Sequence, residues 1–284
     1  MKKTYPRVLS IAGSDPSGGA GIQADIKSCS ANGVYAATAI TAVVDENTVG
    51  VTGVHPVPDA FVAGQIRSVL GDVGADAVKI GMLHSASLIR TVRRTLDEFP
   101  EVGAIVLDPV MVATSGDALL ESDAVASLCA DLIPRATIIT PNIPEAEILL
   151  GRRVAEGEDL AGVGRELASR FPGVAVYLKG GHGVDGVVED VLVGAPGAEV
   201  VRFSAPRVNT VNTHGTGCTL SSAIASHLAL GKSVAEACEA AHAYVHGAIA
   251  AGALYEIGRG HGPVHHFWNQ TPSKAATSSS EAAV

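Results

Sequence analysis

A glycine-rich turn directly before an apolar, helix-like segment is the feature of this chain best suited to chemistry. The turn contains Gly215, Thr216 and Gly217, and Cys218 follows it. Backbone N–H groups at a helix start have no partners within the helix and lie at the positive end of its dipole, so they are able to bind phosphate. The same dipole favours a thiolate, so we expect Cys218 to have a lowered pKa and to act as a base. Alternatively, the glycines only cap a buried helix and Cys218 is a small packing residue.

Short β-branched segments alternate with helical segments along most of the chain. We predict buried strands at residues 8–13, 36–44, 76–81, 104–111, 136–142 and 174–181. Helices are predicted around Ile22 and Asp25, near 58–73, and from about Gly217 and Val234, while residues 186–193 and 199–206 predict an antiparallel hairpin. Such strand–helix repeats are typical of an α/β fold whose central sheet is mostly parallel, with helices on both faces. The hairpin is expected at one edge of that sheet.

Polar side chains stand where the predicted strands end, which is the edge at which open α/β sheets bind ligands. Asp108, Asn142 and Lys179 follow three of the strands, and Glu145 comes shortly after Asn142. The carboxylates of Asp108 and Glu145 suit an Mg²⁺ ion that carries nucleotide phosphates, and Lys179 adds a mobile positive charge. Together with the glycine turn, these groups predict a phosphoryl-transfer site in which Cys218 accepts the proton of the attacking hydroxyl.

Each of the strand-end residues also has a purely structural interpretation. Asp108 is able to cap a turn before Pro109, and Asn142 to start a helix before Pro144. Lys179 could simply be solvated. The glycine-rich segment 13–21 matches neither a P-loop nor a GxGxxG motif, so it gives little support to either of those nucleotide sites.

Length and composition limit the class of protein. We assign residues 1–269 of the 284 to one α/β domain and predict that 270–284, which are small and polar, form a disordered tail. A formal net charge of −9 argues against nucleic-acid binding and favours small-molecule partners. No apolar run approaches the roughly 20 residues that span a bilayer, and no signal-peptide core precedes the first strand, so we expect a cytoplasmic protein.

The four cysteines form neither a disulfide framework nor a metal motif. Cys29, Cys129 and Cys238 lie far apart in helix-like segments, and no CxxC pair occurs. The simplest interpretation is that these three are packing residues.

The order and spacing of the motifs closely resemble one family. The segments concerned are IAGSDPSGGAGIQADIK (11–27), ENTVGV (46–51), KIGM (79–82), LDPVM (107–111), TPNIPEAE (140–147), LKGGH (178–182), RFSAPRVNTVNTHGTGCTLSSA (202–223) and GPVHHFW (262–268). From about Val8 to Trp268 the chain resembles the hydroxymethylpyrimidine/phosphomethylpyrimidine kinases of thiamine biosynthesis, which belong to the ribokinase-like superfamily. The resemblance implies that ATP and Mg²⁺ are used to phosphorylate 4-amino-5-hydroxymethyl-2-methylpyrimidine and then its monophosphate, in a homodimer.

The resemblance also implies roles for individual residues. Cys218 matches the family's base, and the amides of Gly215, Thr216 and Gly217 match those that hold the transferred phosphate. Asp108 and Glu145 match residues that serve the Mg²⁺–ATP end. The nucleotide-side residues are Asn142, Lys179 and Thr213. The pyrimidine pocket is expected to comprise Gly13, Ala20, Asp25, Val44, Glu46, Met82 and Val110.

Glu46 departs from the family pattern, which commonly has Gln in a QNT motif at this place. Asp45 adds a second acid beside it. A Gln amide both accepts and donates hydrogen bonds, whereas an ionised carboxylate only accepts them, so the substitution changes how an aminopyrimidine could be bound. Alternatively, Glu46 turns outward and a backbone group replaces its contact.

Two further functions remain open from the sequence. A pyridoxal or pyridoxine kinase of the same superfamily acts on a similar hydroxymethyl heterocycle, although THGTGC and GPVHHF favour the pyrimidine kinase. A non-catalytic pyrimidine- or nucleotide-binding regulator is the candidate from another class, although Asp108, Glu145, Lys179 and Cys218 favour an enzyme. We expect no fused thiamine-phosphate synthase.

Overall fold

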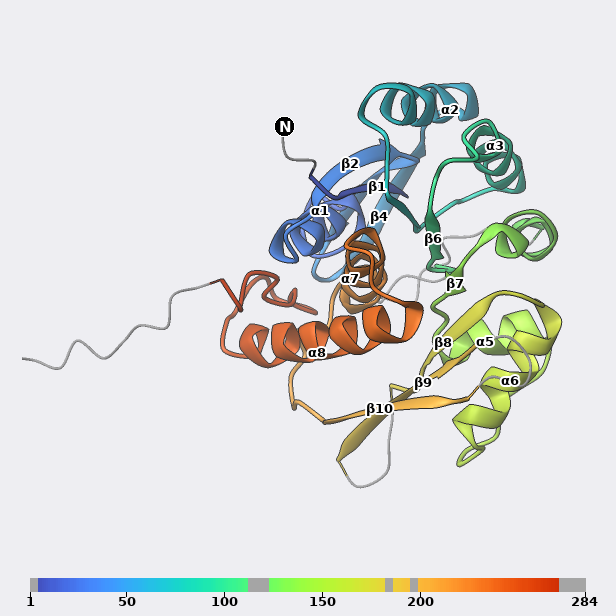
Figure 1. The fold of residues 1–284 in the computed structure, drawn as a ribbon. Coiled ribbons are helices and arrows are strands. Elements are labelled where there is room, and N and C mark those ends of the chain that lie inside the picture. The colour runs from blue at the N-terminus through green and yellow to red at the C-terminus, as the bar shows by residue number, and fades with distance from the viewer. Residues whose placement is uncertain (1–4, 112–122, 182–185, 195–198, 271–284) are drawn as a thin grey trace, which may run out of the picture.

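The structure, a computed structural model, describes residues 5–111, 123–181, 186–194 and 199–270. Within these ranges the centre of the molecule is an eight-stranded sheet of order β10-β9-β8-β7-β6-β5-β1-β2 (Figure 1). Six neighbouring strands are parallel. They are β1 (Arg7–Ala12), β2 (Tyr35–Ile40), β5 (Ala77–Ile80), β6 (Ala104–Leu107), β7 (Ile138–Ile139) and β8 (Ala175–Lys179).

The predicted hairpin closes one edge of the sheet. It consists of β9 (Val187–Val193) and β10 (Val201–Pro206), and β9 pairs antiparallel with both β8 and β10. The predicted fold class, a mostly parallel α/β sheet with an antiparallel edge, is therefore confirmed.

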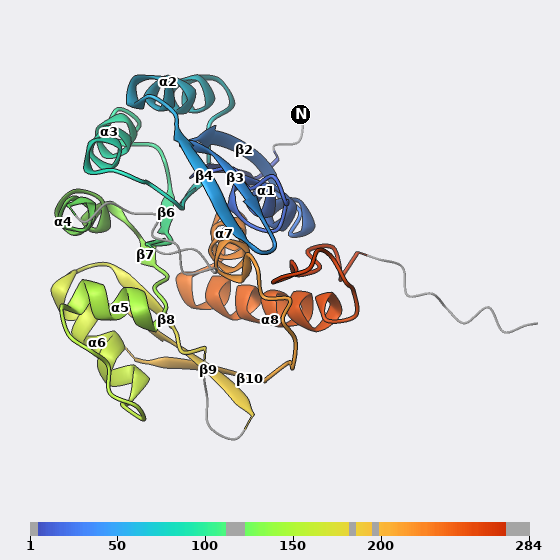
Figure 2. The same cartoon turned by 180° about the vertical axis from the view of Figure 1, so that it is seen from behind.

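Helices cover both faces of the sheet, as Figures 1 and 2 show from opposite sides. One face carries α1 (Gly21–Ala31), α7 (Thr216–Ala229) and α8 (Val234–Gly252). The other carries α2 (Asp59–Ser68), α3 (Ala86–Asp97), α4 (Ala124–Ser127), α5 (Ile143–Leu150) and α6 (Leu160–Arg170). Short π-helical or 3₁₀ turns extend α2 and α4, at η1 (Val69–Val73), η2 (Leu128–Leu132) and η3 (Ile133–Arg135).

Each face of the sheet has its own hydrophobic core, because successive side chains of a strand point to opposite faces. Val78 and Ile80 of β5 pack with Leu88 of α3, whereas Ala77 of the same strand packs with Ile224 of α7. Full burial of each large aliphatic side chain contributes about 1.5–3 kcal/mol. The core on the α1, α7 and α8 face packs α7 against the sheet and so positions the turn at its start.

Three of the cysteines belong to these cores. Cys29 and Cys238 are completely buried on the α1, α7 and α8 face, and Cys129 packs against the opposite core. Their interpretation as packing residues is confirmed.

A second, two-stranded sheet was not predicted from the sequence. The predicted strand 36–44 is divided at Thr41, whose hydroxyl donates a hydrogen bond to the Met82 carbonyl oxygen (2.8 Å). The chain then forms β3 (Ala42–Asn47) and β4 (Gly50–Pro56), an antiparallel pair with a β-bulge between Asp45 and Glu46. Ala42, Val44 and Met82 form a small buried apolar cluster. The prediction of one strand at 36–44 is wrong because β-branched residues continue through Thr41, where the chain leaves the central sheet.

The predicted tail, 270–284, lies outside the described residues except for Gln270. The side chain of Gln270 donates a hydrogen bond to the Ala31 carbonyl oxygen (2.9 Å). Among the described helices, none is long and apolar enough to cross a membrane.

Candidate active site

A cavity of about 460 Å³ lies at the carboxyl ends of the central strands. Its walls come from the segments that follow β1, β5, β6, β7 and β8, from β3, and from the start of α7. Most of the predicted site residues line it, namely Gly13, Ala20, Val44, Glu46, Met82, Asp108, Val110, Asn142, Glu145, Lys179, Gly215, Thr216, Gly217 and Cys218. The structure therefore brings together residues that are as much as 205 positions apart in the chain, from Gly13 to Cys218.

The glycine turn requires glycine at Gly215 and holds Gly217 close to two charged side chains. Gly215 precedes α7 with a φ of +79°, and a Cβ there would lie 1.8 Å from the Gly19 carbonyl oxygen. A Cβ at Gly217 would lie 3.4 Å from Lys179 Nζ and 3.5 Å from Asp108 Oδ2. The turn thus holds the start of α7 against the 13–21 loop and leaves space next to a lysine and a carboxylate. A purely capping role for the glycines does not account for that second contact.

Cys218 is the third residue of α7 and lines the cavity, as predicted. The predicted low pKa is wrong for this state of the molecule. Burial raises the pKa of the thiol to about 11, although the positive charge of Lys79 and a hydrogen bond from the Gly21 N–H oppose that rise. The helix dipole is worth only about 0.3–1 kcal/mol at most helix ends, which is less than the cost of removing a thiolate from water.

Lys179 forms an ion pair with the two acids at the strand ends. Its Nζ lies 3.1 Å from Asp108 Oδ1 and 3.9 Å from Glu145 Oε2. The Thr140 hydroxyl also donates to Asp108 (2.9 Å). Lys179 is therefore not a solvated surface residue, and the Asp108 side chain is not simply the cap of a turn.

The acids at this end of the cavity are short of positive charge. Burial raises the pKa of Glu145 to about 7; Lys179 lowers it and Asp108 raises it. Burial acts to lower the pKa of Lys179, but the carboxylates of Asp108 and Glu145 outweigh it, so that pKa is raised. Two carboxylates with one ammonium group form a site that would be stabilised by a further cation.

Asn142 holds Glu145 in position by capping α5. Its side-chain oxygen accepts from the Glu145 N–H (2.8 Å), and the Glu145 carboxylate accepts from the Asn142 N–H (2.8 Å). This capping box satisfies two N–H groups that the helix leaves free. The helix-start interpretation of Asn142 is confirmed, and the residue also lines the cavity.

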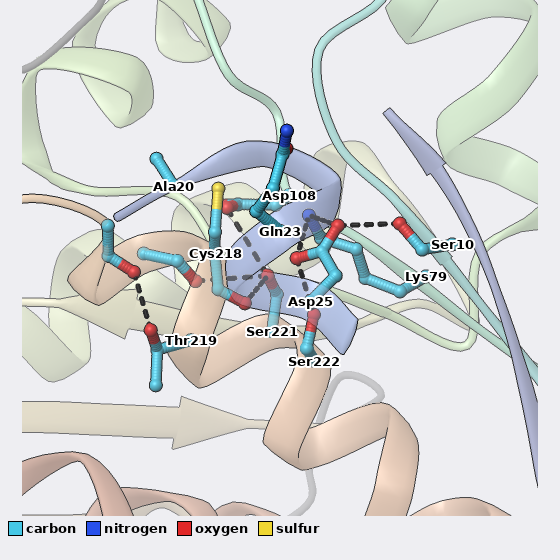
Figure 3. A network of polar contacts seen from close by, with 12 residues as sticks. Ser10, Ala20, Gln23, Asp25, Lys79, Asp108, Cys218, Thr219, Ser221 and Ser222 are labelled. Carbon is cyan, nitrogen blue, oxygen red and sulfur yellow. Dashed lines mark hydrogen bonds and ion pairs between the residues drawn. The ribbon is translucent and has the colours of Figure 1, made fainter. Parts of the chain in front are cut away.

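Asp25 does not line the cavity, contrary to the prediction that it contacts the pyrimidine. Its carboxylate is completely buried and pairs with Lys79 (2.8 Å). The hydroxyls of Ser10 and Ser222 donate to the same carboxylate, as Figure 3 shows. The amphipathic pattern of α1 placed Asp25 on the correct helix but did not reveal that it points into the protein.

A charged cluster that joins Glu46 to two residues without a predicted role, Asp15 and His214, also lines the cavity. His214 Nε2 lies 2.8 Å from Asp15 Oδ2 and 4.0 Å from Glu46 Oε1. Burial acts to lower the pKa of His214, but the hydrogen bond and charge of Asp15 and the charge of Glu46 outweigh it, so that pKa is raised. Burial acts to raise the pKa of Asp15, but hydrogen bonds from His214, Ser17 and Ala20 bring it well below its usual range. His214 lies in the THGTGC motif, directly before the glycine turn, and this position was the only indication in the sequence that it belongs to the site.

The ligand atoms of this cluster lie close enough to hold a metal ion. The Asp15 carboxylate, however, already accepts from the N–H groups of Ser17, Gly19 and Ala20 as well as from His214. Its Oδ2 atom is thereby satisfied within the protein, so we describe the cluster as a histidine between two carboxylates and not as a metal site. Glu46 points inward, because the alternation along β3 leaves Asp45 exposed and Glu46 half-buried.

A second cavity, of about 540 Å³, adjoins the first. The two share Lys179, Gly181, Thr216 and Gly217. Thr213 lines the second cavity and not the first. Apolar residues of β10, α7 and α8 also line the second cavity. Lys179 and the glycine turn thus stand at the boundary between the two cavities.

Fold and site together define a ribokinase-like small-molecule kinase. An anion-binding turn and an acid–lysine group lie between two ligand-sized cavities, at the carboxyl edge of a mostly parallel sheet. The model of the phosphomethylpyrimidine kinase family matches residues 15–265, and the chain belongs to this family.

Individual relatives agree with this assignment. The chain is 49% identical over 259 residues to the hydroxymethylpyrimidine/phosphomethylpyrimidine kinase of Rhizobium meliloti (strain 1021). The match covers 91% of this chain and 96% of that relative. The solved phosphomethylpyrimidine kinase from Clostridium difficile 630 has a TM-score of 0.73 and 41% identity, covering 84% of this chain and 97% of that one. The Bacillus subtilis pyridoxal kinase in its ADP complex has a TM-score of 0.85 but 32% identity, covering 94% and 100%. The predicted kinase fold, family and enzyme class are confirmed.

Proposed function

We propose that the chain transfers phosphate from ATP to 4-amino-5-hydroxymethyl-2-methylpyrimidine and then to the resulting monophosphate, in thiamine biosynthesis. This proposal rests on one observation: a glycine turn, Cys218, an acid–lysine group and a small apolar pocket all line the first cavity. Membership of the phosphomethylpyrimidine kinase family and 49% identity to a kinase with both activities in its name support it.

The heterocycle is held at the end of the cavity farthest from the acid–lysine group. Val44, Met82 and Val110 supply apolar walls, and Glu46 supplies a hydrogen-bond acceptor. A ring placed there directs its hydroxymethyl group towards the start of α7. Holding the acceptor in this way replaces an entropically costly encounter with a positioned one.

The transferred phosphate is stabilised by fixed and mobile positive charge. The N–H groups at the start of α7 provide oriented dipoles, and the Lys179 ammonium lies beside Gly217. Such preorganised groups favour the charge that develops on the phosphate oxygens in the transition state. Cys218, in the same helical turn, accepts the proton of the hydroxymethyl oxygen as that oxygen attacks.

Asp108 and Glu145 fit the Mg²⁺ ion that kinase chemistry calls for. Both are buried carboxylates that share one lysine, and oxygen donors of this kind suit Mg²⁺. When bound, the ion would neutralise charge on the nucleotide phosphates. The protein's own contribution is to keep the two carboxylates in position, through Thr140 and through the cap of α5.

The second cavity is proposed to take the nucleoside of ATP. It begins at Lys179, Thr216 and Gly217, where the phosphates would lie, and it extends along β10 and α8. The position of Thr213 in this cavity supports its expected place on the nucleotide side. Asn142 lines the first cavity, and we propose that it faces the phosphates from there.

We further propose one kinase domain, residues 1–269, that acts in the cytoplasm as a homodimer. Exposed apolar side chains on the β3–β4 hairpin support the dimer, because Val43, Val49 and Val54 are all at least 41% exposed. Light scattering behind size-exclusion chromatography tests it, and a monomeric mass at micromolar concentration would contradict it.

Pyridoxal phosphorylation is the second candidate activity, favoured by the TM-score of 0.85 to a pyridoxal kinase. The deciding experiment is an ATP assay with hydroxymethylpyrimidine, its monophosphate and pyridoxal in parallel, with Cys218→Ala as control. We expect both pyrimidines to be phosphorylated much faster than pyridoxal. Turnover of pyridoxal alone would replace the proposed substrate, and absence of any turnover with intact nucleotide binding would indicate a regulator.

A further inference from the structure

A completely buried ion pair lies next to α7 and has no part in the chemistry described so far. Lys79 of β5 and Asp25 of α1 are both 0% exposed, with Nζ 2.8 and 2.9 Å from the two carboxylate oxygens. The Ser10 and Ser222 hydroxyls complete the carboxylate's hydrogen bonds (Figure 3). Replacing a buried ion pair with apolar residues is often neutral or stabilising, so stability alone does not explain this pair.

The pair is held within about one helical turn of the cysteine thiol. Cys218 and Ser222 are four residues apart in α7, so their Cβ atoms are neighbours, about 6 Å apart, on one face of the helix. The Ser222 hydroxyl donates a hydrogen bond to Asp25, which places the ion pair beside the second turn of α7, one turn after Cys218. Lys79 and Asp25 are completely buried, so their charges are screened less than those of a surface pair.

We propose that Lys79 is a positioning residue that makes the Cys218 thiolate available as the base, and that Asp25 limits the strength of its positive charge. This inference depends on the proposed function only in giving Cys218 that role. In the open cavity the thiol loses its proton to water, and the thiolate later takes the proton of the hydroxymethyl oxygen. Burial opposes the first of these steps, since it raises the pKa of Cys218 to about 11 while the charge of Lys79 acts to lower it.

Other charged groups face the same thiol and do not provide this stabilisation as directly. Asp108 acts to raise the pKa of Cys218, as does Asp25. Lys179 is the other ammonium group near the thiol, but it is shared between Asp108 (3.1 Å) and Glu145 (3.9 Å). Lys79 is paired with a single carboxylate.

The test measures how fast iodoacetamide modifies Cys218 at different pH values, in protein without nucleotide or Mg²⁺. Mass spectrometry of the peptides separates Cys218 from the other three cysteines. Lys79→Met removes the positive charge that faces the thiol and leaves Asp25 without its partner. We expect the pKa of Cys218 to rise by about one unit or more. At pH values below the pKa of Cys218, the modification should then slow about tenfold. Asp25→Asn leaves the cation uncompensated and should accelerate the modification. Ser10→Ala removes one hydrogen bond to Asp25 without changing any charge and should leave the rate unchanged.

The opposite signs of the two charge variants separate electrostatics from structural damage. A wild-type pH profile in Lys79→Met, or slower modification in both charge variants, would overturn the proposal. If Lys79→Met does not fold, the comparison of Asp25→Asn with Ser10→Ala decides. Faster modification of Cys218 in Asp25→Asn than in Ser10→Ala supports the role of Lys79, and an unchanged or slower rate refutes it. The modification rate reports the fraction of Cys218 that is thiolate and does not depend on catalysis. Full kinase activity in Cys218→Ala would therefore refute the base assignment even if these rates behave as expected.

Discussion

The two phosphorylation steps make different demands on Cys218. The hydroxymethyl group must lose a proton when it attacks, whereas a phosphate monoester, with a second pKa of about 6, has already lost it at neutral pH. A base in the first turn of α7 is therefore needed for one step and not for the other.

Cys218→Ala should affect the two steps unequally. We expect kcat for hydroxymethylpyrimidine to fall by a factor of ~10²–10⁴, with a much smaller loss for the monophosphate. The measurement is ADP release with each substrate separately, with nucleotide affinity as the control. Equal losses in both steps would mean that Cys218 supports the site structurally, and retention of most activity in both would make it a packing residue.

Glu46 sets a second condition at the residue scale, because its carboxylate only accepts hydrogen bonds. The ring nitrogen beside the amine of the pyrimidine offers a lone pair, so binding must take up a proton. The imidazole of His214, 4.0 Å from Glu46 and with a raised pKa, favours the ionised carboxylate, which leaves the ring nitrogen as the site of that proton.

Pyrimidine affinity should therefore weaken as pH rises, by up to about tenfold per unit above the pKa of the free ring nitrogen. Glu46→Gln supplies an amide donor and should flatten this dependence. Calorimetry in two buffers of different ionisation enthalpy measures the proton uptake directly. Wild-type protein that takes up no proton and behaves like Glu46→Gln would show that Glu46 does not contact the pyrimidine.

At the scale of elements, a buried contact joins two of the segments that line the cavity. The 13–21 loop and the segment before α7 meet through Asp15 and His214, and the close approach of Gly215 to the Gly19 carbonyl oxygen accompanies that contact. The pKa of His214 is raised and that of Asp15 is lowered. The contact consequently contributes fully above the unfolded pKa of Asp, about 3.9, and below that of His, about 6.5.

His214→Gln should reveal this window, since Gln keeps a donor for Asp15 but carries no charge. We expect a loss of about 2 kcal/mol in unfolding free energy near pH 5.5. The loss should diminish as pH rises through the raised pKa of His214, or falls through the lowered pKa of Asp15. Urea denaturation at several pH values measures it. A difference that stays constant from acid to alkaline pH would mean that the imidazole is neutral throughout and contributes only by packing.

At the scale of the whole molecule, the sheet brings together the cavity proposed for the pyrimidine and the cavity proposed for ATP, with a charged group at its carboxyl edge. Asp108, Glu145 and Lys179 lie there with a net charge of −1 when both acids are ionised, and burial raises the pKa of Glu145 to about 7. A cation that favours the ionised acids completes the charge balance of this group.

Asp108→Asn or Glu145→Gln should raise the Mg²⁺ concentration needed for half-maximal activity, because each variant removes one anionic oxygen donor. We expect the circular dichroism spectrum to remain that of the wild type. The measurement is a Mg²⁺ titration of kcat at saturating ATP, with Thr140→Val as the control for the hydrogen bond to Asp108. Unchanged titrations in both acid variants would place the metal elsewhere.

The sequence alone determined the order of the central-sheet strands along the chain and most of the cavity. Apolar strands that are followed by helices specify a parallel sheet, and polar residues at strand ends such as Asp108 and Lys179 must then share its carboxyl edge. The resemblance in motifs located Met82, Val44 and Cys218 at the same edge.

Only the tertiary structure decided what depends on burial and on contacts between distant segments. Asp25 points into the protein because Lys79 and Ser222 arrive there from other elements, and no periodicity in α1 records this. The β3–β4 hairpin leaves the central sheet where Thr41 is hydrogen-bonded to Met82, and the pKa of His214 is raised by Asp15, 199 residues away. Likewise the pKa of Cys218 is set by its desolvation and by a buried lysine. A local sequence pattern specifies a helix start, but the free energy of a charge there depends on everything that packs around it.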